Sequence, residues 1–408
     1  MLSCSRARSC LLPGSQHKHF RGRTRPMNRL SLAVVYAIVF VSFFDNHSLL
    51  PIMAPYARSL GASMGLVGLI VGTYSAVNLV GNLGAGYWTD RVGRKAPIVL
   101  GLTIVGLVLL AYPWATRLEI LLGLRALHGL GAAMTAPASL AYIGDAAAAA
   151  GRGRAMAVYG AFIGLTVLVG PPLAGLIRDR LGYAYIFALL SFLVLIMVVP
   201  AWLLISETYA KTTRLAWRET ARLLRQPRLS VAYTSAFCLM FSLGTLIVFL
   251  PLLSQDLGLS SAQAGLLFAS FALAAILIQA LPTGRLSDRW GRRRLIVLGL
   301  TIAGGALAIL PLSPGWERLL AVMFIYGLGF GFLFPAMTAL LADETGIQTR
   351  GTAAGVFTAV YSLAVTVGTA ATGALVWLQQ ATGLHPFQFA ALIVLPALAW
   401  AGVAWARK

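Results

Sequence analysis

The sequence predicts an all-α polytopic membrane protein, with twelve transmembrane helices arranged as two six-helix, pseudo-symmetric bundles. Three observations predict this fold. First, 59% of the 408 residues are hydrophobic and only 11% are charged, whereas soluble domains carry about a quarter charged residues. Second, apolar runs of about 20 residues recur along the chain, which is the length that an α-helix needs to cross a bilayer. Third, the chain repeats itself at a constant offset. A soluble enzyme and a disordered chain are both excluded.

The apolar runs begin near Leu30 and continue to Trp405. Glycine and proline inside them are compatible with membrane helices, because neighbouring helices satisfy the backbone groups that these residues leave free. The twelve predicted spans are 31–52, 63–87, 96–114, 118–142, 154–177, 184–205, 230–252, 262–284, 295–312, 317–341, 352–377 and 385–405.

The basic residues predict the orientation of the spans. Twenty-six of the 32 Lys and Arg fall in alternate connections, counted from the N-terminus. By the positive-inside rule, both termini and the basic linker 206–229 are therefore expected in the cytoplasm. This sorting also explains the net charge of +20 without a nucleic-acid partner.

Residues 1–29 are predicted to form a cytoplasmic N-terminal segment. Residues 1–26 hold six basic and no acidic residues, a composition that also fits an organelle transit peptide. We favour a start at Met27, because Asn28, Arg29 and a spanning run follow it at once. The Ala-, Gly- and Arg-rich composition favours a bacterial cytoplasmic (inner) membrane.

The three cysteines give no sign of a metal site, a disulfide framework or a bound cofactor. Cys4 and Cys10 lie in the first 26 residues, and Cys238 lies in an apolar run. Their spacing fits no metal motif. We therefore expect neither a metal nor another cofactor.

An internal repeat divides the chain. Residues 84–153 match the chain 198 positions later, so that Glu119 pairs with Glu317 and Pro137 with Pro335. The repeat predicts an N-terminal bundle over 30–205 and a C-terminal bundle over 230–408. Paired bundles of this kind are known in secondary transporters, where the substrate site lies between the halves near the midplane of the bilayer.

A motif follows the second span and is repeated after the eighth. It reads Gly-Tyr-Trp-Thr-Asp-Arg-Val-Gly-Arg-Lys over 86–95 and Gly-Arg-Leu-Ser-Asp-Arg-Trp-Gly-Arg-Arg over 284–293. It resembles the signature loop of the major facilitator superfamily, and the resemblance covers the chain from about residue 30 onward. The resemblance implies a conformational latch that holds the halves together in one state. Its residues would be Gly86, Asp90, Arg91, Gly93, Arg94 and Asp145, with Gly284, Asp288, Arg289, Gly291, Arg292 and Asp343 as their counterparts. A purely topogenic positive loop is the alternative.

The fourth span carries an arginine inside the apolar run. A charge within the bilayer is costly and is kept where it faces a cavity or a partner. The repeat mate of Arg125 is Met323, which indicates a functional charge in the first half only. The resemblance implies that Arg125 acts in proton coupling or substrate contact. His128 lies one turn further on, as a proton carrier or as a packed polar residue.

The fifth span resembles the Gly-Pro motif of the drug:proton antiporters in this superfamily. Its residues here are Gly164, Gly170, Pro171 and Gly175. Small residues allow close helix approach and proline allows a kink. Ala174 stands where a glycine is usual, and the upstream glycine spacing is irregular. The motif favours efflux over uptake.

Asp45 is the one acidic residue deep in an apolar run. Burial favours the neutral form of a carboxyl group, which suits a group that loads and releases a proton. The alternatives are a carboxylate at the outer mouth of the cavity and one permanently paired with a polar neighbour. His47, nearer the outer end, is a further candidate to share the proton.

The cavity lining can be outlined from polar and aromatic residues in the central spans. The spans hold no cluster of several charged side chains, which counts against highly anionic substrates and, more weakly, against sugars. The candidates are Tyr36, Asn78, Asn82, Gln279, Tyr361 and Trp377.

The sequence therefore predicts a proton-coupled exporter of lipophilic or cationic small molecules that works by alternating access. Its expected partners are a small-molecule substrate, protons and the lipid bilayer, with no nucleic acid, and we expect a monomer. A facilitator or efflux permease for a metabolite such as a sugar or an amino acid is the alternative. A receptor on the same fold is less favoured. An enzyme is not expected, because His128, Asp45 and Cys238 lie in different spans without the context of a catalytic motif.

Overall fold

The structure is a computed structural model that describes residues 29–146, 152–207, 226–281, 290–346 and 349–406. These residues form helices joined by short turns, with no strand among them. Residues 1–28 of the predicted N-terminal segment 1–29, and residues 208–225 of the basic linker 206–229, lie outside the described residues.

The first group of helices covers the predicted N-terminal bundle. Its elements are α1 (Arg29–Ser48), α2 (Met53–Ser59), α3 (Met64–Val92), α4 (Lys95–Ala111), the 3₁₀ turn η1 (Tyr112–Trp114), α5 (Leu118–Ala146), α6 (Arg152–Leu181) and α7 (Tyr183–Leu204).

The second group covers the predicted C-terminal bundle. Its elements are α9 (Pro227–Asp256), α10 (Ser261–Ala280), α12 (Arg292–Ile309), the 3₁₀ turn η3 (Leu310–Leu312), α13 (Trp316–Asp343), α14 (Arg350–Ala370), α15 (Thr372–Thr382), α16 (Pro386–Leu392) and α17 (Val394–Ala406).

Each predicted span corresponds to helix, but several spans are interrupted. Ten helices of the described chain are long and apolar enough to cross a membrane, and α15 with the α16–α17 segment forms a further pair bent by 99°. The predicted run 31–52 ends early, because α1 stops at Ser48 and the chain turns around Pro51 before α2. α5 is not among the ten, since its interior carries Arg125 and His128.

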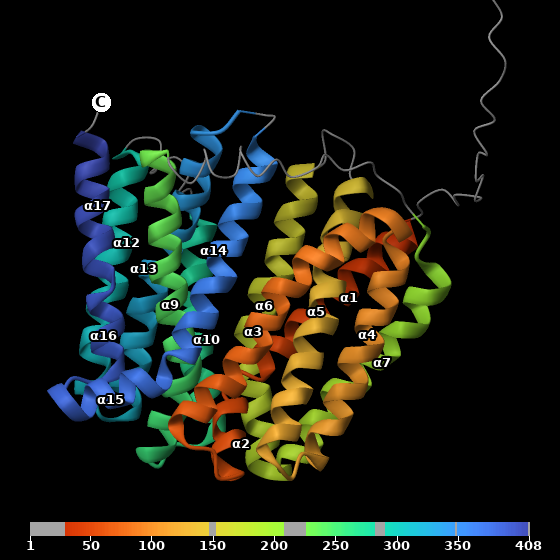
Figure 1. The fold of residues 1–408 in the computed structure, drawn as a ribbon, viewed down its shortest axis with the longest axis horizontal. Coiled ribbons are helices and arrows are strands. Elements are labelled where there is room, and N and C mark those ends of the chain that lie inside the picture. Colours follow the sequence, from red (N-terminus) through yellow and green to blue (C-terminus); the bar gives the residue numbers. More distant parts are fainter. Residues whose placement is uncertain (1–28, 147–151, 208–225, 282–289, 347–348, 407–408) are drawn as a thin grey trace, which may run out of the picture.

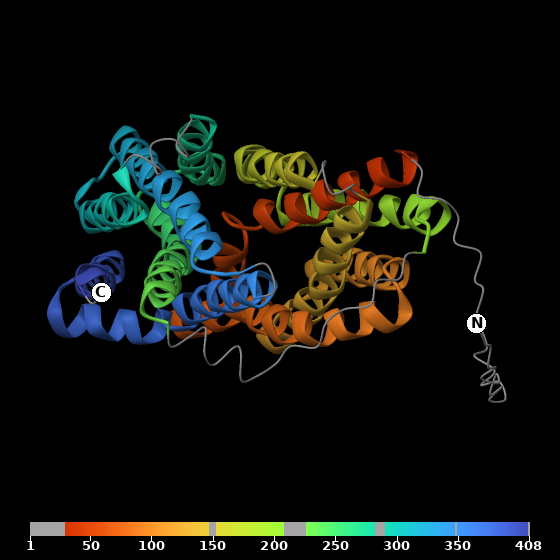
Figure 2. The same cartoon turned by 90° about the horizontal axis from the view of Figure 1, so that it is seen from above.

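The two groups stand side by side (Figures 1 and 2). Within the first group, α3 packs on α5, α1 on α6 and α4 on α7. Within the second, α12 and α10 pack on α13, and α14 packs on α9. The start of α1, the end of α7, the start of α9 and the C-terminal end of α17 lie at one end of the molecule, at the top of Figure 1. We call this the linker end and the opposite one the distal end.

The halves meet through α6 against α10 and α3 against α14, and these contacts are tightest toward the distal end. A Cβ atom at Gly175 would overlap the backbone of Ser261, and Gly65 faces Gly373 across the interface. Nearer the linker end, a Cβ atom at Gly160 of α6 or at Gly355 of α14 would meet nothing within 4 Å. Each pair of helices therefore separates from the distal end toward the linker end.

Polar contacts also join the halves at the distal end. Arg58 Nη1 lies 2.9 Å from Asp256 Oδ1. The carboxylate of Asp179, at the end of α6, accepts hydrogen bonds from the backbone N–H groups of Ser261 (3.1 Å) and Ala262 (2.7 Å) at the start of α10. A carboxylate at a helix N-terminus satisfies free N–H groups and interacts favourably with the helix dipole.

Candidate functional site

Three buried polar side chains form a hydrogen-bonded chain between α1, α5 and the end of α4. His128 Nε2 lies 2.9 Å from Asp45 Oδ2, and His128 Nδ1 lies 2.9 Å from the Tyr112 hydroxyl. Asp45 is 2% exposed, and His128 and Tyr112 are 0% exposed. Both ring nitrogens of the histidine therefore have a partner, and its tautomer depends on which of the three groups holds the proton.

Arg125 lies next to this chain, one turn before His128 on α5. Its guanidinium carbon is 4.7 Å from the centre of the Tyr74 ring, and Nη2 donates to the backbone carbonyl of Val71 at 3.2 Å. The Tyr74 ring meets the His128 ring edge-on at 5.0 Å. The arginine is thus held over an aromatic face, while the histidine contacts the same ring.

Two charged groups in this cluster keep an unused polar atom. Asp45 Oδ1 and Arg125 Nη1 are buried and have no hydrogen-bond partner within the described part of the chain. Buried polar atoms are usually paired, so each exception calls for a physical reason. A carboxylate, an imidazole and a phenol in hydrogen-bond contact can exchange protons, and the two unused atoms can each form a further hydrogen bond.

The second half carries a neutral version of this contact. The repeat mate of His128 is Tyr326, whose hydroxyl lies 2.7 Å from Ser242 Oγ on α9. Met323 stands in the place of Arg125, as the sequence indicates. Among the described residues, the aspartate–histidine form of the contact is therefore found in the first half.

His47 does not join the chain in this structure. Its Nδ1 lies 2.8 Å from Thr166 Oγ1 on α6, and its ring stacks on Phe43. Of the four residues predicted for coupling or substrate contact, the structure brings Asp45, His128 and Arg125 into one cluster and leaves His47 on a separate contact. Tyr112 and Tyr74 were not predicted, because both are aromatic residues in apolar runs.

The predicted cavity residues are scattered over several helices. The Tyr36 hydroxyl donates to the Ala155 carbonyl at 3.2 Å. Asn78 donates to the Gly129 carbonyl at 3.3 Å, and Asn82 donates to Asn78. Gln279 is exposed and Tyr361 is half-buried. Trp377 lies on α15, beyond the end of α14, and is 65% exposed. Only the two asparagines lie beside the cluster, through Gly129, the residue after His128.

The predicted latch residues form equivalent ion pairs in the two halves. Arg94 Nε lies 3.3 Å from Asp145 Oδ2, and Arg292 Nε lies 2.9 Å from Asp343 Oδ2. Both pairs join residues 51 positions apart. Each pair lies within one half at the linker end, so neither of them bridges the halves in this conformation.

Gly93, and Glu207, which was not predicted as a site residue, shape the connection between α3 and α4. Gly93 ends α3 with φ +101°, and Gly291 precedes α12 with φ +84°, a region that favours glycine. Glu207 packs against Gly93 and accepts a hydrogen bond from Lys95 N at 3.3 Å. The predicted basic linker includes Glu207, and no sequence signal could place it at the start of α4, because Glu207 and Lys95 lie 112 positions apart.

The other predicted latch residues are described only in part. Arg91 is exposed at the end of α3. Gly86 and Asp90 lie in α3, but their packing is not among the described features. Gly284, Asp288 and Arg289 lie outside the described residues.

The Gly-Pro motif of α6 faces both α10 and α1. Gly164 lies opposite Ile276, and Gly175 opposite Ser261, both on α10. A Cβ atom at Gly170 would lie 3.0 Å from Ser48 Oγ on α1. The backbone of Pro171 packs against Gly265 of α10. The motif therefore brings the halves into backbone contact at the distal end.

Known proteins resemble this chain over nearly its whole length. The sequence pattern of the Major Facilitator Superfamily matches residues 35–235 and 232–408. "Multidrug resistance protein 2" of Bacillus subtilis is 28% identical over 92% of this chain and 95% of its own length. "Chloramphenicol resistance protein" of Pseudomonas aeruginosa is 26% identical over 76% of this chain and 75% of its own length.

The fold is also that of a solved transporter. The crystal structure of a bacterial homologue of the human lysosomal transporter Spinster, in an inward-facing and unoccupied conformation, superimposes with a TM-score of 0.76 at 17% identity. The match covers 94% of this chain and 96% of that one. With both halves matched by the family pattern, the chain belongs to the major facilitator superfamily of membrane transporters.

Proposed function

We propose that the protein is a proton-coupled antiporter that exports lipophilic or cationic small molecules by alternating access. The observation that carries the proposal is the buried Asp45–His128 pair at 2.9 Å, set beside Arg125 in an otherwise apolar helix group. Ionisable residues inside a membrane domain are costly and mark substrate or proton pathways.

The pair offers a simple basis for exchange. When Asp45 is ionised, its unused Oδ1 atom can attract a proton or a cationic group of a substrate. The two compete for one negative charge, so binding of either one favours release of the other. Arg125 carries a fixed positive charge beside Asp45. Once Asp45 is neutral, this charge disfavours binding of a substrate cation, so the cation binds only when the proton has left.

The relative position of the two halves indicates which state of the transport cycle this conformation represents. The positive-inside rule puts the linker end, and with it both termini, in the cytoplasm. The helix pairs between the halves are in contact at the distal end and separate toward the linker end, so this conformation is inward-facing in the proposed orientation. We propose that the division at the linker 206–229 separates the two moving bundles, and that a monomer in a bacterial inner membrane carries out the cycle.

We further propose that the latch residues stabilise the opposite, outward-facing state. The pairs Arg94–Asp145 and Arg292–Asp343 lie at the end that would close in that state. The names of the relatives favour drug export: two of them are called multidrug resistance proteins and one a chloramphenicol resistance protein.

The test is transport by the purified full-length chain in proteoliposomes. An acidic lumen should drive accumulation of a fluorescent lipophilic cation such as ethidium, with an accompanying alkalinisation that a trapped pH dye reports. Asp45→Asn should abolish gradient-driven accumulation and also exchange of labelled for unlabelled cation, because asparagine offers a negative charge to neither the proton nor the cation. His47→Asn is the matched control and should keep both activities, because His47 contacts Thr166 and not Asp45.

Two outcomes would contradict the proposal. Gradient-driven accumulation that survives Asp45→Asn would remove the coupling role from this residue. A reconstituted chain that moves no lipophilic compound, but equilibrates a sugar or an amino acid without moving protons, would establish the metabolite permease instead.

A further inference from the structure

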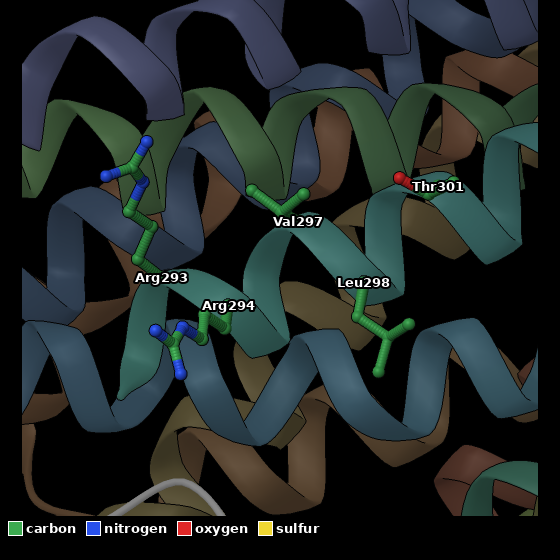
Figure 3. Close-up of a pocket in the computed structure, with 5 residues that line it drawn as sticks. All are labelled: Arg293, Arg294, Val297, Leu298 and Thr301. Carbon is green, nitrogen blue, oxygen red and sulfur yellow. The ribbon is translucent and has the colours of Figure 1, made fainter. Parts of the chain in front are cut away.

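We propose that a groove along α12, at the linker end of the second half, binds an anionic phospholipid. The groove has a volume of about 520 Å³ and is lined by Arg293, Arg294, Val297, Leu298 and Thr301 (Figure 3). It is separate from the Asp45 cluster, which lies in the other half.

The lining residues follow the axis of the helix. Arg293, Val297 and Thr301 are spaced four residues apart, and so are Arg294 and Leu298, which places them in two adjacent rows. With a rise of 1.5 Å per residue, the groove extends about 12 Å from the first arginine to Thr301. Figure 3 shows both guanidinium groups toward the start of α12 and the apolar side chains further along it. Positive charge at one end and an apolar wall below it match a phospholipid, with its phosphate and its acyl chain.

The position of α12 exposes this groove to the bilayer. α12 packs on α13, α16 and α17 of its own half, and in Figure 2 it lies at the outer margin of the second group, away from the first. Arg293, Arg294 and Thr301 are exposed, and Val297 and Leu298 are half-buried. A lipid can therefore reach the groove from the side without entering the space between the halves.

The internal repeat shows that two adjacent arginines occupy these positions in the second half, whereas the first half has one basic residue there. The residues 198 positions earlier are Lys95, Ala96, Val99, Leu100 and Thr103, so the apolar row is kept while alanine replaces Arg294. The Lys95 ammonium lies 5.1 Å from the centre of the Trp202 ring, which covers the equivalent position.

Charge complementarity selects an anion. Arg292, the neighbour of this pair, is engaged by Asp343, whereas no carboxylate of the described residues lies within ion-pair distance of Arg294. Arginine binds phosphate oxygens through two parallel hydrogen bonds, and basic pockets between membrane helices on the cytoplasmic side bind anionic headgroups. A free phosphate would contact only the arginines, whereas a lipid also covers Val297 and Leu298, so the groove favours the lipid.

Native mass spectrometry of the delipidated full-length chain tests this site. Phosphatidylglycerol should bind more tightly than phosphatidylcholine with the same acyl chains. The double variant Arg293→Gln/Arg294→Gln should weaken phosphatidylglycerol binding about thirtyfold and leave phosphatidylcholine unchanged. Lys95→Gln, the matched control in the first half, should bind phosphatidylglycerol like the parent chain. Thermal denaturation of each purified variant checks that it is folded.

Competition separates a lipid from a free anion. Glycerol 3-phosphate carries the phosphate without acyl chains and should not displace phosphatidylglycerol at millimolar concentration. Displacement by glycerol 3-phosphate would show a site for free phosphate. Equal binding of the two lipids, or undiminished phosphatidylglycerol binding to the double variant, would overturn the proposal.

Discussion

The contact between Asp45 and His128 joins side chains 83 positions apart on two helices. The sequence could single out both residues, because each is polar within an apolar run. It could not show that they meet, since that depends on how α1 is rotated against α5. Tyr112 had no signal at all: it ends an apolar run, and only the turn at η1 brings its hydroxyl to His128. The histidine, which the sequence left open as a packed polar residue, is the central member of the chain.

We expect His128→Ala to destabilise the protein, because it leaves both Asp45 and Tyr112 without their buried partner. The loss should be about 2–3 kcal/mol, the range for a buried hydrogen bond to a charged group together with the unpaired groups that remain. The measurement is the free energy of unfolding of the purified chain in a detergent–SDS titration.

Ser242→Ala provides a matched control for this substitution. It removes the neutral Tyr326–Ser242 bond from the corresponding region of the second half, and it should cost about 1 kcal/mol, the net value of a neutral bond. A loss for His128→Ala that is no larger than the loss for Ser242→Ala would show that the aspartate–histidine contact has no special strength.

At the scale of the helix, the sequence predicted most elements and missed their interruptions. Hydropathy identifies a run but not a turn inside it, and the division at Pro51 and the 99° bend after Thr382 depend on local backbone geometry. The Gly-Pro motif of α6 was recognised as a close-packing segment. Its partner could not be predicted, because small residues pack closely on any neighbouring helix. The structure identifies that partner as α10 at Gly175 and Gly265.

We expect Gly175→Ala to shift the protein away from the conformation described above, in which the distal end is closed. The added methyl group would overlap the backbone of Ser261, and a backbone cannot rotate away as a flexible side chain can. The readout is the spin–spin distance between labels on Thr116→Cys and Leu257→Cys, in a chain without its native cysteines. The population with the longer distance across the distal end should increase at least fivefold, which corresponds to about 1 kcal/mol.

Gly160→Ala is the matched control on the same helix. Its methyl group would meet nothing within 4 Å, so the distance distribution should stay that of the parent chain. If Gly175→Ala leaves the distribution unchanged as well, contact between α6 and α10 does not limit how closely the halves approach.

For the whole molecule, the repeat predicted two matching halves but not their relative position. The apolar runs of the sequence predict the helices of each half, and most helix–helix packing lies within a half. The angle between the halves is set by a smaller number of contacts at the distal end, such as Arg58–Asp256 and the Asp179 carboxylate on α10. These contacts must be broken in a transport cycle, so no single arrangement follows from the sequence.

Alternating access requires that the distal end open, and the structure offers a place to prevent it. Gly65 and Gly373 face each other across the halves: a Cβ atom on Gly373 would lie 3.2 Å from the Gly65 Cα atom, and one on Gly65 would lie 3.7 Å from the Gly373 Cα atom. Cysteines at both positions are within the reach of a disulfide bond. We expect oxidised Gly65→Cys/Gly373→Cys to lose at least 90% of gradient-driven transport in proteoliposomes and to recover it on reduction, because the bond holds the distal end closed.

Each single cysteine variant, treated with the same oxidant, separates this effect from the substitution itself and should keep its transport rate. Gel mobility after protease cleavage within the linker 206–229 reports how much of the double variant is cross-linked, since the bond joins the two halves of the cut chain. Full transport in a completely cross-linked sample would mean that substrate crosses without separation of α3 from α15. The rocking of two bundles would then be the wrong description, although the Asp45–His128 pair could still couple protons to transport. Loss of transport that is reversed by reduction would show that the Asp45–His128 pair, which we propose to carry protons, can support transport only when the distal end can open.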